Sequence, residues 1–499
     1  MQGEISENTK RMLYGKKTWL QMLLLSLPIL INNLIKSFNG MVDIYFVSRM
    51  EGSSETISSA IAALNLHETF NNLILALGVG LSIGAMAVVS QFIGAKRYDK
   101  AKYFSGQFIA LSVIVGIVLT IFILVTSWLI IPLMGAKGQT FEFAFSYFNI
   151  RSFELVGVVF FTVYQAIRQS QGSTVLPTIY NVLGILLNIV LTWYFVSVLK
   201  MGVMGSAWAT LIGNMIFVPF MLLDLYRSKK YIKLKTKDLL PRKESIKELW
   251  PFAYPAALSH AITYFGFFII NVFVQRVYGD DISSAFATGN KLSSLLMNPI
   301  YAITTISAVF IGANIGHGKP ERARKIYNES GVMTFSITVV AITIAIIYRK
   351  PFVEALVGPG NPYLVKVSIE YTIWLLLTQP AMAIFQNYMA IFNGSGNSDL
   401  GMKAQSFRLW VLRIPMLIIL FIFFKNLSYS IVWIAMNVSN ILALFHAHHL
   451  TKRVSLEVKV NIEDGGQTAW YTLCYVNLKF HKMLEISWEL VLVQMLGYI

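Results

Sequence analysis

The sequence predicts an all-α polytopic membrane protein with twelve transmembrane helices, arranged as two parallel six-helix repeats. Hydrophobic residues make up 56% of its 499 residues and charged residues only 13%, whereas about 25% of a soluble domain is charged. Apolar stretches of about 18 residues or more recur from end to end, and each is long enough to cross a bilayer as a helix. These stretches are continuous rather than alternating, which excludes a transmembrane β-barrel.

Twelve such stretches are predicted, with boundaries placed to within a few residues. They cover residues 18–48, 58–92, 104–133, 141–167, 175–197, 203–226, 249–277, 283–313, 329–349, 364–392, 403–424 and 428–449. The first is too long and too polar inside to be a cleaved signal peptide. Most connecting loops are short, so we expect no folded extramembrane domain before residue 450.

Basic residues fall in alternate loops, and this pattern predicts how the helices are oriented. They gather in the N-terminal segment, after the second and eighth helices, and in the loop 227–248. Because loops rich in Lys and Arg stay in the cytoplasm, we expect both termini there and a multi-pass chain in the cell membrane. The net charge of +16 then reflects topology, and no nucleic-acid partner is expected. The single cysteine, Cys474, excludes an intrachain disulfide and a cysteine metal site.

Four short motifs recur in the same order in the two halves of the chain. They pair 45–50 with 272–277, 57–62 with 282–287, 92–95 with 310–313, and 170–174 with 394–398. Six helices per repeat is an even number, so both halves enter the membrane from the same side. They should be related by an axis along the membrane normal, with a cleft between them, which is typical of transporters.

The predicted organisation therefore has four parts. Residues 1–226 form an N-terminal six-helix half, 227–248 a basic cytoplasmic linker, and 249–450 a C-terminal six-helix half. The remaining residues, 451–499, form a cytoplasmic tail that is rich in aromatic residues but has no apolar run of membrane-spanning length. The sequence assigns no role to this tail.

Asp43 lies inside the first apolar stretch, where a charged side chain costs about 2.5–3.5 kcal/mol unless it faces protein or water. Asn32, Lys36, Asn39 and Asp43 follow one another in steps of four, three and four residues, so they share one helix face. Polar faces also occur on the fourth, fifth and sixth helices. Their members are Tyr147, Arg151 and Glu154; Asn181, Gly184, Asn188 and Thr192; and Ser206, Thr210 and Asn214. All belong to the first half, which predicts a polar cavity there.

Each of these residues also has a purely structural interpretation. Isolated Ser, Thr and Asn side chains in membrane helices usually join neighbouring helices by hydrogen bonds. Arg151 and Glu154 can pair at i,i+3, and Lys36 can extend toward a membrane surface. Asp43 has no basic residue within one helical turn, so we favour a role in binding and releasing a proton or cation.

Other motifs are weaker candidates. Glu68, which follows His67, and Glu370 lie toward the outer ends of their helices. The histidines of 446–449 have a spacing that can bind a metal, but an interfacial basic cluster fits them better, so no metal site is predicted. The glycine-rich run 78–85 indicates close helix packing, because it lacks the preceding strand and the following lysine of a phosphate-binding loop.

These features resemble the MATE (multidrug and toxic compound extrusion) family, most closely its DinF-like branch, over about residues 15–450. "SLPILINNLIKSFNGMVDIYFVSRM" (26–50) resembles the family's first helix, and "VVSQFIGAKRYDKA" (88–101) resembles the loop that follows its second helix. "RQSQGSTVLPTIYNVLGILLNIVL" (168–191) and "MGVMGSAWAT" (201–210) resemble the connection between its fourth and fifth helices and the start of its sixth.

The resemblance implies an antiporter that exports organic, often cationic, compounds in exchange for protons or sodium ions, with no cofactor other than the coupling ion. Asp43 matches the branch's central ionisable aspartate. Tyr147, Asn188 and Thr210 match its tyrosine, asparagine and threonine on helices four, five and six. Pro28 matches the proline at which the first helix is thought to bend when the acid changes its protonation state.

One departure from the family pattern concerns the fifth helix. Where the family often has a second aspartate one turn after the asparagine, this sequence has Thr192. A threonine oxygen can coordinate sodium but cannot take up a proton, which makes Glu154 a candidate secondary proton site. The family's other branch, with acids in its seventh and eighth helices, fits poorly, because the seventh helix here has His260 and no acid.

We therefore expect a monomer in membrane lipid that works by alternating access and exports small organic cations or amphipathic drugs. The alternative is a lipid-linked oligosaccharide flippase of the same superfamily. The basic residues Lys36, Arg151, Arg408 and Arg413 keep it open, while the number of helices, twelve, counts against it. An enzyme is not expected, because no nucleophile–base pair stands out. An ATP-driven pump is not expected either, because the chain has no GxxxxGK[ST] motif.

Overall fold

The computed structural model describes residues 7–228, 232–357, 361–424 and 429–460. Met1–Lys459 form one compact unit and Val460–Ile499 a second one, and all the described helices belong to the first unit. Of the predicted tail, residues 461–499 lie outside the described part of the chain.

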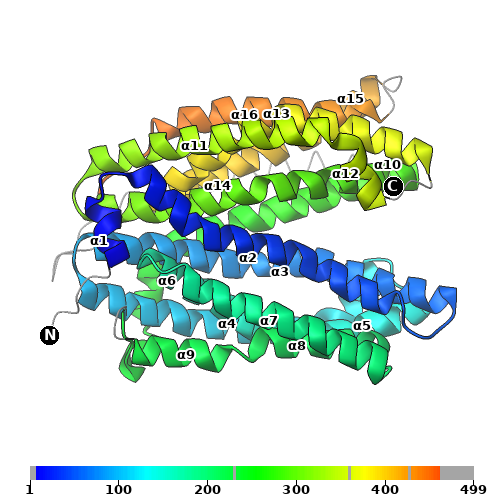
Figure 1. The fold of residues 1–499 in the computed structure, drawn as a ribbon, viewed down its shortest axis with the longest axis horizontal. Helices are drawn as coiled ribbons and strands as arrows, with labels where there is room; N and C mark the ends of the chain where they lie inside the picture. Colours follow the sequence, from blue (N-terminus) through cyan, green and yellow to red (C-terminus); the bar gives the residue numbers. More distant parts are fainter. Residues whose placement is uncertain (1–6, 229–231, 358–360, 425–428, 461–499) are drawn as a thin grey trace. The chain divides into compact units, whose positions relative to one another are not determined.

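The first unit is a bundle of long helices (Figure 1). The first half contains α1 (Glu7–Tyr14), α2 (Thr18–Val47), α3 (Ser54–Gly94), α4 (Tyr98–Leu133), α5 (Gly138–Ser152), α6 (Glu154–Ser170), α7 (Val175–Thr192), α8 (Gly202–Met215) and α9 (Val218–Arg227). The second half contains α10 (Lys243–Gly316), α11 (Pro320–Ile347), α12 (Arg349–Val357), α13 (Pro362–Gly394), α14 (Ser398–Ser406), α15 (Ile414–Phe423) and α16 (Ser430–Thr451). Apolar sequence forms helices here because a helix satisfies its own backbone N–H and C=O groups in lipid.

The predicted fold class is confirmed. Among the described residues, ten helical segments are long and apolar enough to cross a membrane, and an eleventh is the pair α5 and α6, which is bent by 47°. One of the ten is α10, whose 74 residues include a break at Gly279, where φ is +78°. This length corresponds to two spans, so dividing α10 at Gly279 gives the twelve expected spans.

Several of these spans are interrupted, and the interruptions have local causes. Pro28 lies inside α2, where it cannot donate a backbone hydrogen bond, and its carbonyl accepts a hydrogen bond from Thr178 Oγ1 of α7 at 3.1 Å. A π-helical segment, Trp193–Val198, continues α7. A second one, Phe407–Arg413, joins α14 to α15. Such widened turns are common at functional sites.

The two halves pack closely where α3 and α10 end. A Cβ atom added to Gly94 would lie 1.9 Å from the carbonyl oxygen of Ala313, and one added to Gly316 would lie 2.0 Å from that of Gln91. The Gly94–Ala313 contact joins the "FIGA" motifs of the two repeats. Only glycine allows two backbones to approach this closely. We call this end of the unit, where α2 also begins and α16 ends, the basic end, because it carries Lys96 and the other basic loop residues.

The N-terminal helix α1 contacts both halves at the basic end. Thr9 Oγ1 donates a hydrogen bond to the carbonyl of Gln171 in the α6–α7 loop at 2.9 Å. On the other side, Asn314 Nδ2 of α10 donates to the carbonyl of Met12 at 3.4 Å. α1 therefore bridges the first half and the second.

The segment that follows α16 forms a second bridge. The backbone N–H of Lys459 donates to Oε1 of Gln91 in α3 at 3.1 Å. Asn397, in the α13–α14 loop, donates through Nδ2 to the carbonyl of Ser455 at 3.2 Å. No role for this segment follows from its sequence, and the structure shows that residues 455–459 join the two halves.

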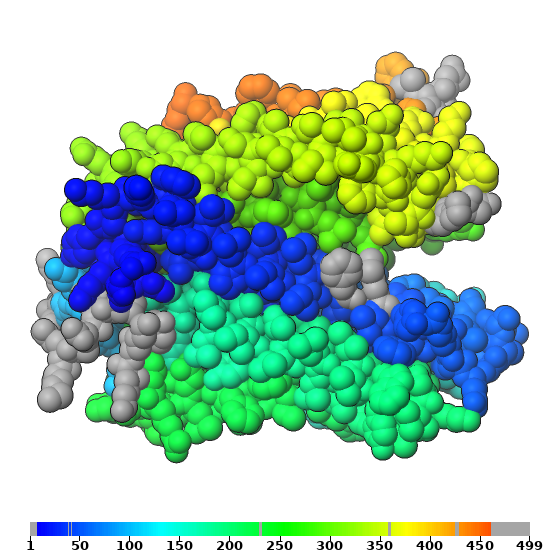
Figure 2. Space-filling view, viewed as in Figure 1, coloured from blue at the N-terminus to red at the C-terminus, as the bar shows by residue number. Residues whose placement is uncertain are grey.

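The two halves separate toward the opposite end. Figure 2 shows the surface hollowed between them there, with α2 and α3 on one side and the second half on the other. The bundle is thus closed at the basic end and open at the opposite end.

Candidate functional site

A cavity of about 320 Å³ lies within the first half. Its walls come from α2, α3, α5, α6, α7, α8 and α9. Among its lining residues are the following members of the predicted polar faces: Lys36, Asn39, Asp43, Tyr147, Arg151, Glu154, Asn181, Gly184 and Asn214. The structure therefore brings these side chains to one place, and their roles in transport stay predictions.

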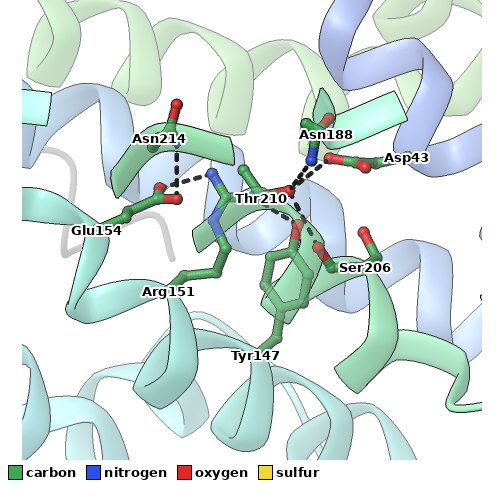
Figure 3. A network of polar contacts seen from close by, with 8 residues as sticks. All are labelled: Asp43, Tyr147, Arg151, Glu154, Asn188, Ser206, Thr210 and Asn214. Atoms are coloured by element: carbon green, nitrogen blue, oxygen red, sulfur yellow. Dashed lines mark hydrogen bonds and ion pairs between the residues drawn. The ribbon is translucent and has the colours of Figure 1, made fainter. Parts of the chain in front are cut away.

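Asp43 lies where α2, α7 and α8 meet (Figure 3), with 5% of its surface exposed. Thr192 Oγ1 of α7 donates a hydrogen bond to Asp43 Oδ1 at 3.2 Å. Thr210 Oγ1 of α8 lies 3.4 Å from Asp43 Oδ2, and Asn188 Nδ2 donates to Thr210 Oγ1 at 2.9 Å. A cation or proton that binds Asp43 thus acts on contacts between three helices.

This network accommodates Asp43 with or without a proton. Thr210 has one hydroxyl proton, and the carbonyl of Ser206 accepts it at 3.0 Å as an alternative to the carboxylate. A protonated Asp43 can donate to Thr210 Oγ1, while Thr210 donates to Ser206. An ionised Asp43 can accept from Thr210 instead.

The same place also offers oxygen atoms to a metal cation. Asn188 Oδ1 is buried and has no hydrogen-bond partner in the described part of the chain, and the side chain of Ser206 is placed to hydrogen-bond with Asp43. Unpartnered buried polar atoms are rare in proteins. Together with the carboxylate of Asp43, these two side chains form a set of oxygen ligands of the kind that hard cations prefer.

Arg151 and Glu154 form an ion pair next to this network. Arg151 Nη2 lies 2.6 Å from Glu154 Oε1, and Arg151 Nη1 donates to the hydroxyl of Tyr147 at 2.7 Å. Asn214 Nδ2 donates to the other oxygen of Glu154 at 3.1 Å. Glu154 therefore has partners on both oxygens, which favours the pairing interpretation over a free proton site.

The bend between α5 and α6 positions this ion pair. It falls at Phe153, between Arg151 and Glu154, so the two side chains come from the two arms of the bend. Thr120 Oγ1 of α4 donates to the carbonyl of Ser152 at 2.8 Å. This hydrogen bond satisfies a backbone group at the break, as a membrane interior requires.

The other predicted residues of α2 and α7 lie along the same cavity. Asn181 Nδ2 donates to Asn32 Oδ1, which ties α7 to α2 about three turns from Asp43. Lys36 lines the cavity, with its Nζ 5.1 Å from the centroid of the Phe161 ring. Asn39 Oδ1 is buried and has no partner among the described residues.

Three residues with rings line the cavity although they are not among the site residues predicted from the sequence. The His67 ring packs edge-on against the ring of Tyr147, with centroids 5.0 Å apart. Phe161 and Tyr180 supply aromatic surface to the cavity. Aromatic residues are frequent throughout this chain, so only the fold selects these two. Glu68 also lines the cavity and is exposed.

The candidates of the second half lie away from this cavity. Glu370 Oε2 accepts a hydrogen bond from Tyr429 at 3.2 Å. His448 Nδ1 lies 3.1 Å from the hydroxyl of Tyr388, while the His446 ring stacks on Phe407. Within the described residues, no group of three or more His, Cys, Asp or Glu side chains is placed to hold a metal.

Arg408 and Arg413 are both buried in the second half. Arg413 Nε donates to Ser439 Oγ of α16 at 2.8 Å. Arg408 Nη1 lies 3.4 Å from the sulfur of Met382. These two cations belong to the packing of the second half, so they do not make the cavity of the first half basic.

Two curated proteins with similar sequences are multidrug export proteins. The "Multidrug export protein MepA" of Staphylococcus aureus (strain bovine RF122 / ET3-1) is 24% identical over 267 residues, which are 54% of this chain and 58% of that protein. MepA of Staphylococcus saprophyticus subsp. saprophyticus is 26% identical over 267 residues, which are again 54% of this chain and 58% of that protein. The matched region thus spans 58% of the length of these curated relatives.

Solved structures share the fold. One described as the outward-facing conformation of a multidrug resistance MATE family transporter of the MOP superfamily has a TM-score of 0.82 and 22% identity, covering 90% of this chain and 99% of that one. A MOP superfamily transporter from Pyrococcus furiosus Vc1, whose reverse pocket polarity is said to suggest a different function, has a TM-score of 0.81 and 23% identity, covering 92% and 100%.

The profile of the MatE family matches the chain twice, at residues 28–194 and 255–419. One match falls in each half, and the first contains the α2 and α7 residues around Asp43. Because they cover more than half of the 499 residues, the chain belongs to the MatE family.

Proposed function

We propose that this protein is a secondary active antiporter, not an enzyme, that exports organic, mainly cationic or amphipathic, compounds in exchange for protons or sodium ions. Membership of the MatE family and similarity to multidrug export proteins support the transporter class. The observation that carries the mechanism is the burial of Asp43 against Thr192 and Thr210 at a cavity wall. The chain works as a monomer in the cell membrane, with the basic end in the cytoplasm.

In this mechanism the coupling ion and the substrate cation compete for Asp43. With the opposite end open, the ion enters from outside and neutralises the carboxylate. Substrate then loses its counter-charge and leaves. α2 repacks around Pro28, the closed contacts of the basic end separate, and the ion is released inside as substrate binds. Alternating access of two related halves around one site supplies the geometry for this exchange.

Two observations support the participation of Pro28. Its carbonyl already accepts a hydrogen bond from Thr178 of α7, so a bend at this point changes the α2–α7 contact. That same contact includes Asp43 and Thr192 farther along both helices. Neutralising Asp43 weakens one end of the contact, and the proline provides a place where α2 can bend in response.

The test uses purified protein in liposomes with an imposed proton gradient or sodium gradient, and a fluorescent organic cation as substrate. We expect gradient-driven dye movement with wild type and loss of it in Asp43→Asn. The matched control is Asp280→Asn, which removes an exposed acid at the α10 break and should leave transport unchanged. Equal transport by wild type and Asp43→Asn would overturn the mechanism, and the gradient that drives transport names the ion.

The flippase alternative is not favoured. It requires a basic cavity, and of the four basic residues that kept it open only Lys36 lines the cavity without an acidic partner in the ranges that the structure describes. Arg151 is paired with Glu154, and Arg408 and Arg413 do not line the cavity. Movement of a fluorescent lipid-linked sugar, without movement of any organic cation, would restore it.

A further inference from the structure

Lys36 is a cation in the same cavity as Asp43, and the proposed antiport does not use it. Both residues are on α2 and both line the cavity. They are seven residues apart, which is two helical turns, so they share one face of α2 at an axial separation of about 10 Å. The cavity therefore has a negative end at Asp43 and a positive end at Lys36.

The acids near Lys36 do not neutralise it. Within the described residues Lys36 forms no ion pair, and its recorded contact is the Phe161 ring. Glu154 is committed to Arg151 and Asn214. Asp43 is buried among the hydroxyl groups of α7 and α8. Glu68 also lines the cavity but forms no ion pair with Lys36.

Two structural explanations of Lys36 are weakened by this placement. A lysine that reaches toward a membrane surface carries its ammonium out of the bundle, whereas Lys36 Nζ lies over Phe161 of α6, inside the cavity wall. A lysine that stabilises the fold would pair with an acid. An intramembrane cation is costly, and it usually marks the path of a substrate or ion. The side chain is also exposed, so a ligand in the cavity can reach it.

We propose that Lys36 is the anion-binding end of the substrate site, and that this transporter prefers zwitterions to simple cations. This inference rests on the proposed function. The cationic nitrogen of the substrate pairs with Asp43, and a carboxylate, sulfonate or phosphate group pairs with Lys36. The apolar part of the substrate lies against the rings of Phe161 and Tyr180, both of which line the cavity. A substrate with cationic groups at both ends is repelled by Lys36.

The test compares a rhodamine free acid with its methyl ester. The two dyes share their aromatic rings and their cationic charge, and only the free acid carries a carboxylate. Wild type, Lys36→Gln, Lys36→Arg and the control Lys291→Gln are reconstituted in phosphatidylcholine vesicles. Lys291 is an exposed lysine of α10 in the second half, so its loss changes net charge equally without touching the cavity.

We expect wild type to move the free acid with the higher kcat/KM. Lys36→Gln should lower kcat/KM for the free acid about tenfold, mainly through KM, and leave the ester unchanged or faster. Lys36→Arg should retain most of the preference, and Lys291→Gln all of it. Equal losses for both dyes in Lys36→Gln, or no loss for either, would overturn the proposal.

Two further arms separate this proposal from its neighbours. Asp43→Asn should abolish transport of both dyes, so a failure of the antiport mechanism looks different from a failure at Lys36. If wild type moves neither dye, binding of each dye to the purified protein decides: weaker binding of the free acid alone in Lys36→Gln supports the proposal, and equal binding overturns it. If the effect of Lys36→Gln occurs only in vesicles that contain an anionic phospholipid, Lys36 binds a lipid headgroup, and the proposal is wrong.

Discussion

The imidazole of His317 contacts the backbone carbonyl of Gly94, with Nδ1 3.1 Å from the oxygen. His317 directly follows α10, and Gly94 is the last residue of α3, so this contact joins the two halves at the basic end. The ring of Tyr14, at the end of α1, packs edge-on against the same imidazole, with the two ring centroids 5.2 Å apart. Closure of the basic end therefore includes a titratable group.

This contact predicts that acid favours opening of the basic end. Burial lowers the pKa of His317 below the usual 6.5 or so, and the nearby charges of Lys319, Lys96 and Arg322 lower it further, while the hydrogen bond to Gly94 opposes them. The closed state therefore binds this proton less readily than the open state does. The contribution of neutral His317 to the stability of the closed state is complete above about pH 6.5. It is lost as the pH falls through the lowered pKa of His317.

The measurement is the distance between spin labels at Asp99→Cys and Glu321→Cys, two exposed positions at the basic end, in a cysteine-free Asp43→Asn background that removes titration at the cavity. We expect the long-distance population to grow below about pH 6.5. In His317→Gln, which keeps a side-chain donor and cannot gain a proton, the populations should not change with pH. The same pH response in both proteins would contradict the prediction.

Glycine packing between α3 and α10 predicts a second way to disturb closure. Gly94→Leu places a side chain against the backbone of Ala313, where even a Cβ atom would lie 1.9 Å from the carbonyl oxygen. Overpacking of this kind costs about 1–3 kcal/mol, and here the cost falls on the closed state alone. The long-distance population of the same labels should rise at neutral pH. Gly40→Ala is the control, because nothing lies within 4 Å of its added Cβ.

The bridge formed by residues 455–459 leads to a prediction about the start of the tail. Asn397→Ala removes the donor to the carbonyl of Ser455 and the acceptor of Lys459 Nζ. The two halves then lose one of their bridges at the basic end. We expect opening to become more frequent and net transport to slow, because the return to the closed state is less favoured. Lys452→Ala, an exposed change in the same segment, should leave both unchanged.

The sequence predicted the helices well, because lipid leaves an apolar chain few alternatives to a helix. It also grouped Asn32, Lys36, Asn39 and Asp43 on one face, since helical periodicity follows from spacing alone. Spacing could not show how faces from different helices meet. The contact of Thr192 with Asp43 spans 149 residues of sequence, and it depends on how α7 packs against α2.

Two other features lay beyond sequence reasoning for specific reasons. The bend at Phe153 has no proline or glycine to announce it, and it became visible only through the geometry of α5 and α6. Residues 455–459 alternate polar and apolar side chains and carry no motif, and they gain their role from backbone groups that bond Gln91 and Asn397. Backbone hydrogen bonds of this kind leave almost no trace in residue identity.

Variants of the Arg151–Glu154 ion pair test whether Glu154 is a proton site. Glu154→Gln leaves a buried guanidinium without its charge partner, and removing one member of a buried pair typically costs about 3–5 kcal/mol. The single variant should therefore be poorly folded and inactive for structural reasons. The double variant Arg151→Met with Glu154→Leu removes both charges, and we expect it to recover stability and at least part of the transport activity. Thermal unfolding and dye transport of the two variants check this. A stable double variant with no transport would instead support Glu154 as a second proton site.

Replacing Thr192 distinguishes a proton from a sodium ion as the ion that binds at Asp43. Thr192→Val keeps the shape of the side chain and removes the hydroxyl that donates to Asp43 Oδ1 at 3.2 Å. Leaving a buried acceptor without its donor costs about 1–3 kcal/mol, and this cost is larger for the ionised carboxylate than for the protonated one. If protons drive transport, the Asp43 carboxyl group of the Thr192→Val protein should hold its proton more tightly. The pH at which transport is half-maximal should then rise. If sodium drives transport, the variant loses an oxygen ligand, and the sodium concentration for half-maximal transport should rise about tenfold, with Thr192→Ser restoring it. A Thr192→Val protein with unchanged dependence on both ions would show that the Thr192 hydroxyl takes no part in coupling, and that Asp43 works with Thr210 and Asn188 alone.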